Sequence, residues 1–274
     1  MTFLGRGSRA LVGMVHLPPL PGSTNYMGQP FGQIVEQAVR DARALQSAGF
    51  QAGIIQNTHD LPFTATAPPE TVAFLSVVGR EIRRQMDWPI GVNILKNDAP
   101  GALAVAAAVG AAFVRLKVYV GAVLGAEGVL APSAADALRT RQRLGSNVEI
   151  WADLFDRTSV PLVQQPLGQV AEWATKFGGA SVVIVTGDAW DSTLEMARTA
   201  RRVLPATPVA IGGGVTLANV REALDVADVA IVGSALEERP FTGPVSASKA
   251  RALAEAAGSR AHTTGDASRH SPVR

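Results

Sequence analysis

Residues 209–220 read VAIGGGVTLANV: a short apolar run, three glycines, and then a segment with helical spacing. Glycine is unfavourable inside regular structure and useful where a backbone turns sharply or closely approaches another group. The stretch therefore predicts a strand, a tight turn and a helix, which together make one βα unit of a parallel sheet. The number of such units along the chain decides the fold.

Seven further apolar runs precede helical patterns in the same way. We expect strands over residues 11–17, 52–56, 90–95, 113–118, 149–154, 181–186, 209–211 and 229–232. The helices expected after them cover residues 32–48, 70–86, 100–109, 133–144, 167–177, 192–203, 217–223 and 246–257. Eight βα pairs in about 250 residues match a closed barrel, whereas an open doubly wound sheet usually has five or six strands. The sequence predicts an α/β fold, a single-domain (β/α)8 TIM barrel over residues 1–257.

Composition places the chain among ordinary globular proteins. Its 274 residues are 47% hydrophobic and 18% charged, and the formal net charge is +2 at pH 7. That small imbalance gives no indication of a nucleic-acid partner. The longest apolar run, residues 102–114, is too short for a transmembrane segment, which needs roughly 20 residues. Because there is no cysteine, disulfides, thiolate catalysis and thiolate-bound zinc are excluded.

The two ends of the chain carry different signals. The N-terminus lacks the order of a signal peptide, and the absence of cysteine fits a reducing compartment, so we expect a cytoplasmic protein. Residues 258–274 are polar and without periodicity, which predicts a disordered C-terminal tail. Barrels of this kind often form homo-oligomers, and we expect one here, although no residue pattern indicates its symmetry.

Polar residues at the carboxyl ends of the predicted strands are the first candidates for a site, because a barrel builds its site from the loops that follow those ends. The catalytic candidates are His16, Asp60, Asn93, Lys117 and Asp153, and further ligand contacts are expected from Asn57, Thr186 and Asp188.

Most of these candidates also have a structural interpretation. His16 could be a structural hydrogen-bonding residue, and Asn57 and Asp60 could satisfy local backbone donors. Lys117 could reach a substrate as an electrophile or a Schiff-base amine, or it could form a salt bridge with Asp153. The polar alternation of strand four also places Arg115, Lys117 and Tyr119 on one side of it. A cation inside the barrel requires a charged partner.

Acidic and hydroxyl residues also occur at two predicted helix starts and in one acidic pair after strand five. Asp98 is well placed to cap the helix after strand three, and Asp191 or Ser192 to cap the helix after strand six. Asp153 and Asp156 could hold a divalent metal, but no histidine or third carboxylate at ligand spacing supports such a site, and no metal is predicted.

Glycines follow both of the last two strands. GGG after residue 211 and GS after residue 232 stand where barrels commonly bind phosphate, at the loops after strands seven and eight. The predicted phosphate-binding residues are Gly212, Gly213, Gly214, Gly233 and Ser234. The alternative is that the glycines serve only the turns.

The motifs GMVHLPPLPGS, NTHDLPF, GVNILKNDAPGALAVAAAVGAAFVRLKVYVGA, VTGD and GGGVTLANV occur in that order between residues 11 and 243. In these motifs the sequence resembles the BtpA/SgcQ family. The family is similar to the ribulose-phosphate-binding barrels, and its name comes from a factor for photosystem I biogenesis in cyanobacteria. Members also occur in organisms that do not photosynthesise, so the resemblance does not by itself imply the photosystem role.

The sequence departs from the family pattern at two places. Family members often carry a Lys-His pair after strand five, whereas this chain has Arg157 and Thr158. The loop after strand four, GAVLGAEG, lacks the acidic and polar residues that members often carry there, and its glycines suggest a mobile lid. A divergent substrate or a reduced activity would follow.

The leading hypothesis is a barrel that binds a phosphorylated small molecule, either a sugar phosphate or a nucleotide-like compound. A lyase, isomerase or hydrolase using general acid/base chemistry fits the residues, and no cofactor is predicted because no cofactor fingerprint is present. Asp60 or Asp153 would take a proton, His16 would give or stabilise one, and Lys117 would balance negative charge. The alternative is a non-catalytic assembly, biogenesis or regulatory factor, which the altered Lys-His pair favours.

Overall fold

Eight parallel strands of the described residues close into a barrel, as the sequence predicted. The structure is a computed structural model, and it describes residues 4–240 and 243–258. Around the barrel the strands follow the order β1-β11-β10-β9-β7-β4-β3-β2. Their bounds are β1 (Ala10–His16), β2 (Ala52–Gln56), β3 (Ile90–Asn93), β4 (Phe113–Leu116), β7 (Glu149–Asp153), β9 (Val182–Val185), β10 (Val209–Ile211) and β11 (Val229–Val232).

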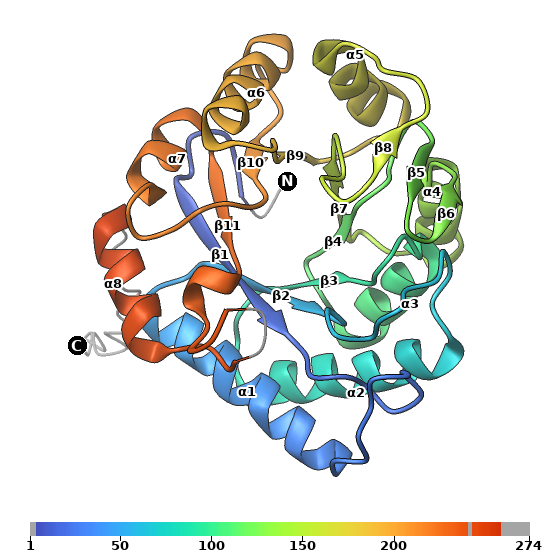
Figure 1. Cartoon of the computed structure of the whole chain (residues 1–274), viewed down its shortest axis with the longest axis vertical. Helices are drawn as coiled ribbons and strands as arrows, with labels where there is room; N and C mark the ends of the chain where they lie inside the picture. Colours follow the sequence, from blue (N-terminus) through green and yellow to red (C-terminus); the bar gives the residue numbers. More distant parts are fainter. Residues whose placement is uncertain (1–3, 241–242, 259–274) are drawn as a thin grey trace, which may run out of the picture.

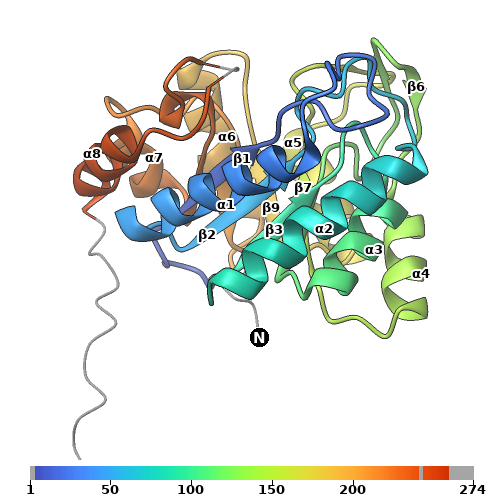
Figure 2. The same ribbon diagram turned by 90° about the horizontal axis from the view of Figure 1, so that it is seen from below.

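Helices form a ring outside these strands (Figure 1). They are α1 (Phe31–Ala48), α2 (Pro69–Gln85), α3 (Ala99–Val109), α4 (Ala134–Arg143), α5 (Leu167–Glu172), α6 (Trp190–Val203), α7 (Val220–Val226) and α8 (Ala247–Ala257). Seen from the side, the long β1–α1 loop and the hairpin that contains β6 lie at the same end of the barrel (Figure 2). Among the described residues, no helix combines the length and the apolar character that spanning a bilayer requires.

The interior of the barrel is apolar toward the amino ends of the strands and charged toward their carboxyl ends. Phe113 and Trp151 stack with ring centroids 3.9 Å apart and are fully buried. Because side chains alternate along a strand, the next inward positions on β4 and β7 are Arg115 and Asp153. An apolar floor therefore lies directly beneath a charged layer.

A small antiparallel sheet interrupts the βα alternation between β4 and β7. Strands β5 (Val123–Gly125) and β6 (Gly128–Leu130) form a hairpin, and β8 (Val160–Pro161) pairs with the other edge of β5. The sequence predicted only a glycine-rich loop here. The hairpin belongs to a three-stranded sheet, and whether it moves as a lid stays a prediction.

Several local predictions are confirmed and others are wrong. Asp98 caps α3, since its Oδ1 accepts from the Gly101 amide at 2.8 Å. Ala189, and neither Asp191 nor Ser192, holds the N-cap position of α6, but Ser192 does cap the helix start from the third position. Its hydroxyl accepts from the Ala189 amide at 3.2 Å and donates to the Ala189 carbonyl at 2.8 Å. Tyr119 lies beyond the end of β4, and its hydroxyl donates to the Gly178 carbonyl, so it does not share the side of Arg115.

Two helices also differ from their predicted ranges. The helix expected over 167–177 continues past Glu172 as a π-helical turn over Trp173–Phe177. The helix expected from residue 217 begins at Val220, because Asn219 closes the preceding turn by accepting from the Thr216 amide at 2.7 Å. Within the predicted tail, residues 259–274 lie outside the described residues.

Candidate functional site

His16 and Glu237 form a hydrogen-bonded pair at the rim of the barrel. His16 is the last residue of β1, and Glu237 follows the short 3-10 helix η2 (Ser234–Leu236) after β11. His16 Nδ1 lies 2.5 Å from Glu237 Oε1, and only 12% and 4% of the two side chains are exposed. An ionised carboxylate can only accept a hydrogen bond, so Nδ1 donates and Nε2 is left for another partner.

Gly233 lies against the free edge of that imidazole. A Cβ built on Gly233 would come within 3.0 Å of His16 Cε1 and 3.5 Å of Nε2. A side chain at this position would therefore crowd the ring. The absence of one keeps the Nε2 edge of His16 open toward the centre of the barrel mouth.

The three consecutive glycines after β10 have different roles. Gly212 donates its amide to the Val185 carbonyl at 2.9 Å, and a Cβ there would lie 2.8 Å from both Arg115 Nη2 and Thr186 Oγ1. Gly214 has φ +77°, a conformation that favours glycine. Within the described residues, the amides of Gly213 and Gly214 donate no hydrogen bond. Gly212 thus serves packing, and the next two amides are available to a ligand.

The amides at the start of η2 are available as well. Those of Ser234 and Ala235 donate no hydrogen bond to any other described residue, and the hydroxyl of Ser234 has no such partner either. The two glycine loops therefore present several unused donors to one place. Groups of this kind bind the oxygens of an anion.

A pocket of about 400 Å³ joins these features, and we call it the mouth pocket. Its walls include both glycine loops, the His16 ring, and three cations. The residues that matter here are His16, Arg115, Lys117, Arg157, Gly212, Gly213, Gly214, Gly233 and Ser234. Seven of these were predicted as site residues from the sequence, and the structure brings those seven together.

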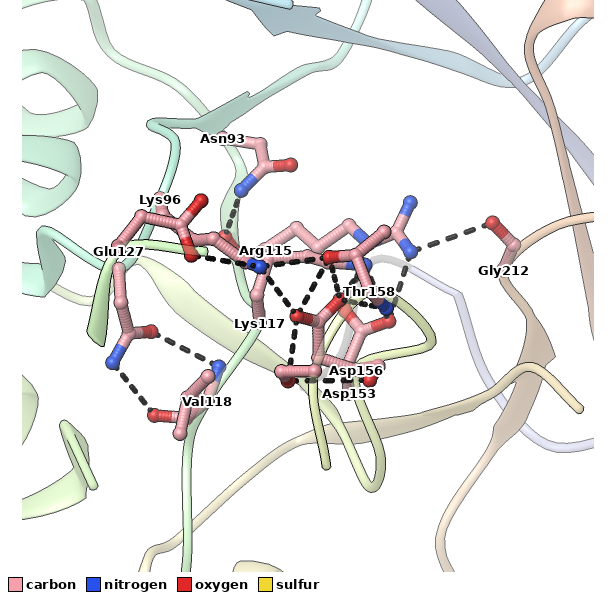
Figure 3. Close-up of polar contacts among 12 residues, drawn as sticks. Asn93, Lys96, Arg115, Lys117, Val118, Glu127, Asp153, Asp156, Thr158 and Gly212 are labelled. Atoms are coloured by element: carbon pink, nitrogen blue, oxygen red, sulfur yellow. Dashed lines mark hydrogen bonds and ion pairs between the residues drawn. The ribbon is translucent and has the colours of Figure 1, made fainter. Parts of the chain in front are cut away.

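A charge cluster of six side chains lies beside the mouth pocket (Figure 3). It consists of Lys96, Arg115 and Lys117 with Glu127, Asp153 and Asp156. Three positive charges meet three negative charges, and none of the six side chains is more than 16% exposed. Buried charges are stable only with partners of opposite sign nearby, and removing a buried charge is costly where it leaves its partner uncompensated.

Arg115 and Asp153 form the deepest pair of the charge cluster. Arg115 Nε and Nη2 donate to the two carboxylate oxygens of Asp153, each at 2.8 Å. The same Nη2 reaches the Gly212 carbonyl at 3.4 Å. Asp153 also holds Lys117 Nζ at 3.3 Å. The salt bridge that sequence reasoning kept as one alternative for Lys117 is therefore present.

Asp156 and Lys96 carry the cluster toward the hairpin. Lys96 Nζ contacts Asp156 Oδ2 at 3.1 Å, Glu127 Oε2 at 3.3 Å and Thr158 Oγ1 at 2.8 Å. Burial alone would raise the pKa of Asp156, but the ammonium groups of Lys117 and Lys96 outweigh it and hold that pKa well below its usual range. Glu127 thus supplies the acidic side chain that the loop after strand four seemed to lack.

Three other predicted residues secure the surrounding loops. Asn57 Oδ1 accepts from the Leu95 amide at 2.8 Å, and Asp60 Oδ1 accepts from the Leu20 amide at 2.8 Å. Burial raises the pKa of Asp60. Asn93 donates to the Arg115 carbonyl at 2.8 Å, while its Oδ1 is buried without a partner among the described residues. None of the three lines the mouth pocket.

Thr186 and Asp188 line a neighbouring pocket of about 370 Å³ that shares Arg157 with the mouth pocket. Thr186 Oγ1 is buried and has no hydrogen-bond partner among the described residues, and it faces Gly212. Buried hydroxyls are nearly always bonded, so this one marks a place where a ligand or water would bind.

Several functional candidates were not in the predicted set. Glu237, Arg115, Lys96, Glu127 and Asp156 all contact a predicted residue or each other. Asp153 and Asp156, the pair considered for a metal, each face two cations. The described residues contain no group of three His, Asp or Glu side chains arranged to hold a metal ion.

Solved structures of similar fold include the N-(5'-phosphoribosyl)anthranilate isomerase from Pyrococcus furiosus. It superposes with a TM-score of 0.56, covers 91% of this chain and 98% of its own, and shares 12% sequence identity. At that identity the likeness concerns the fold alone.

Relatives in sequence are much closer. An uncharacterized protein from Pyrococcus horikoshii is 35% identical over 90% of this chain and 95% of its own. The photosystem I biogenesis protein BtpA from Synechocystis is 33% identical over 83% of this chain and 80% of its own. The model of the BtpA family matches residues 7–259. This chain therefore belongs to the BtpA family.

Proposed function

We propose that the chain binds a phosphorylated small molecule in the mouth pocket and transforms it by general acid/base chemistry. One observation carries the proposal: unused amides of two glycine loops, the His16 imidazole and three cations line one pocket. The phosphate would be held by the amides of Gly213, Gly214 and Ser234. The solved structures of similar fold add nothing to this, because at their sequence identity they show the fold alone.

The electrostatics of the mouth pocket support an anionic ligand. The charge cluster balances its own charges, three against three. Arg157 lies outside that cluster, is exposed, and makes no ion pair with any other described residue. Its guanidinium is therefore a positive charge in excess at the mouth pocket, and it suits the oxygens of a phosphate.

In the proposed reaction His16 is the proton-transfer group. Its Nδ1 donates to Glu237, which fixes the ring and leaves the Nε2 lone pair facing the mouth pocket. Glu237 acts through His16 and is a positioning residue. Asp60 accepts from a backbone amide, and Asp153 is paired with two cations. We therefore assign the role of base to His16 instead.

Lys117 is proposed as the group that balances negative charge on the substrate. Its ammonium group lies 3.3 Å from Asp153 and 3.4 Å from Asp156. Both carboxylates engage the amine nitrogen, which leaves it placed as a donor and not as a nucleophile. The lysine therefore serves as a hydrogen-bond donor and point charge. A lyase, isomerase or hydrolase is compatible with this set of groups.

The test is thermal denaturation with a panel of sugar phosphates and nucleotides, each paired with its unphosphorylated form. Binding to the folded state raises the melting temperature, so we expect a rise only with phosphorylated compounds. Arg157→Gln and Gly213→Val should reduce that rise, and His16→Gln should keep binding while abolishing turnover. No rise with any phosphorylated compound would contradict the proposal.

A biogenesis or assembly role is the second candidate, and the name of the Synechocystis relative favours it. Under that role the barrel is a scaffold, and the mouth pocket needs no turnover. Binding of a phosphorylated compound without any chemical change, in the unaltered chain and in His16→Gln alike, would favour this candidate.

A further inference from the structure

A second, apolar pocket of about 290 Å³ lies beside the mouth pocket, and we call it the apolar pocket. It is bounded by the β4–β5 loop, the segment after β7 and helix α5. Residues that define it are Val123, Leu154, Phe155, Leu162, Val170 and Trp173. Two residues of its rim, Leu162 and Val163, are 51% and 70% exposed, so the rim offers uncovered apolar surface.

Few polar side chains line the apolar pocket. Besides the indole of Trp173, the polar side chains of its lining are Lys117, Asp156 and Gln165. Lys117 and Asp156 are paired with each other at 3.4 Å. A sugar hydroxyl or a nucleobase edge placed deep in this pocket would lose its hydrogen bonds to water, which is unfavourable. An apolar group has no hydrogen bonds to water to lose, so its burial there is favourable.

Lys117 is a wall of both pockets. Three contacts in series lead from it to the glycine loop: Lys117 Nζ to Asp153 at 3.3 Å, Asp153 to Arg115 at 2.8 Å, and Arg115 to the Gly212 carbonyl at 3.4 Å. The two pockets therefore adjoin at Lys117, whose contacts with Asp153 and Asp156 are drawn in Figure 3.

We propose that the apolar pocket receives an apolar substituent of the phosphorylated ligand. The ligand class is then a phosphate monoester that carries a phenyl-sized ring or a branched alkyl group, and not a simple sugar phosphate. The size agrees, because an apolar cavity of about 150 Å³ holds a benzene molecule. This inference rests on the proposed function, since it assumes that the phosphate is held in the mouth pocket.

The test is calorimetric titration with two matched series of phosphate monoesters. One series is ω-phenylalkyl phosphates with linkers of increasing length, and the other is n-alkyl phosphates with the same linkers. Burying the ring should strengthen binding roughly ten- to a hundredfold over the matched alkyl phosphate at the linker length that spans the two pockets.

Two variants with the same added ring localise the effect. Ala122 lines the apolar pocket, and Ala122→Phe should remove the phenyl advantage while leaving alkyl phosphate binding unchanged. Val129 is 64% exposed on β6 and does not line that pocket, so Val129→Phe should keep the advantage. In the unaltered protein, the indole N–H resonance of Trp173 should shift with the phenylalkyl series and not with the alkyl series. That measurement stands even where Ala122→Phe does not fold.

The possible failures are distinct. If both series bind equally and Arg157→Gln weakens both, the proposed function stands and this inference is wrong. If the phenyl advantage persists in Ala122→Phe, or the Trp173 resonance does not move, the ring lies elsewhere and the inference is wrong. If neither series binds, the proposed function loses its support and this inference falls with it.

Discussion

His16 Nδ1 and Glu237 Oε1 lie 2.5 Å apart although 221 residues separate them in the chain. Closure of the barrel between β1 and β11 makes this contact possible, because it brings the first strand beside the last. The pair thus connects the proposed proton-transfer group to the segment that precedes α8.

A double-mutant cycle on this pair should reveal strong coupling. His16→Phe keeps an aromatic ring but removes both ring nitrogens, and Glu237→Gln keeps the shape of the side chain without its charge. Hydrogen bonds to charged groups contribute about 1.5–3 kcal/mol, so we expect a coupling free energy of that order in urea denaturation at pH 7. Strictly additive effects of the two substitutions would show that the contact contributes nothing to folding.

The Arg115–Asp153 pair should be costly to break and less costly to replace. Asp153→Ala leaves a buried guanidinium without its main partner, and we expect a loss of roughly 3–5 kcal/mol in the free energy of unfolding. Arg115→Met combined with Asp153→Leu removes both charges and should be more stable than Asp153→Ala alone. A double variant less stable than that single variant would disagree with this account.

The glycines after β10 should differ in their tolerance of a methyl group. A Cβ on Gly212 would lie 2.5 Å from Ile184 Cγ2, whereas the nearest atom to a Cβ on Gly213 is Thr186 Cγ2 at 3.1 Å. We expect Gly212→Ala to lower stability by roughly 1–3 kcal/mol through overpacking, and Gly213→Ala to lower it less. Thermal denaturation of the two variants side by side measures the difference, and equal losses would argue against the packing role of Gly212.

The hairpin of β5 and β6 should loosen when Glu127 loses its charge. Glu127 pairs with Lys96 at 3.3 Å and so attaches the hairpin to the segment after β3. In Glu127→Gln we expect faster amide hydrogen exchange over Val123–Leu130 and unchanged exchange in the barrel strands. Asp136→Asn, on the exposed face of α4, is the control and should leave the hairpin as it was. Exchange unaffected by Glu127→Gln would mean that β8 and the packing of Val123 and Leu130 against Val118 hold the hairpin without this ion pair.

Asp41 on α1 should make stability depend on pH. Burial raises its pKa from 3.8 to about 6, so between those values the folded state binds more protons than the unfolded state. Stability therefore falls as pH rises through that window and stays lower above it. Asp41→Asn cannot lose a proton, and its advantage over the unaltered chain should grow to roughly 2–3 kcal/mol by pH 7.

Urea denaturation at several pH values from 4 to 7.5 measures this difference. Asp225→Asn is a suitable control, since Asp225 is 59% exposed. If the curves of stability against pH for the unaltered chain and for Asp41→Asn run parallel, the carboxyl of Asp41 does not titrate in that window.

The barrel could be predicted from the sequence because its signals are local. Each strand is a short apolar run with a polar residue or glycine at its end, and β2, β10 and β11 lie over the ranges predicted. The hairpin was missed because strands of three residues show too little alternation. Gly125 pairs with Gly128 across a two-residue turn, and the turn residues Ala126 and Glu127 are not the Asn-Gly or Asp-Gly pair that signals such a hairpin.

Only some of the site residues could be predicted from the sequence, and the reason is physical. Alternation along strand four places Arg115 and Lys117 on one side of the strand, where they need partners, but it does not show which carboxylates reach them. Glu237 and Glu127 come from segments whose place is set by tertiary packing, and nothing near them in the sequence indicates a role. Partners far apart along the chain are fixed by how the barrel closes.

The equal count of positive and negative groups in the charge cluster limits how this protein can change over time. A mutation that removes one of the six upsets this balance, and it costs least where the partner left behind keeps a second contact, as Lys96 keeps Asp156 when Glu127 is lost. Arg157 makes no ion pair with another described residue, so replacing it leaves no buried charge without a partner. Evolution can therefore vary the edge of the mouth pocket one residue at a time, while deep pairs of the buried cluster, such as Arg115 and Asp153, change more readily together.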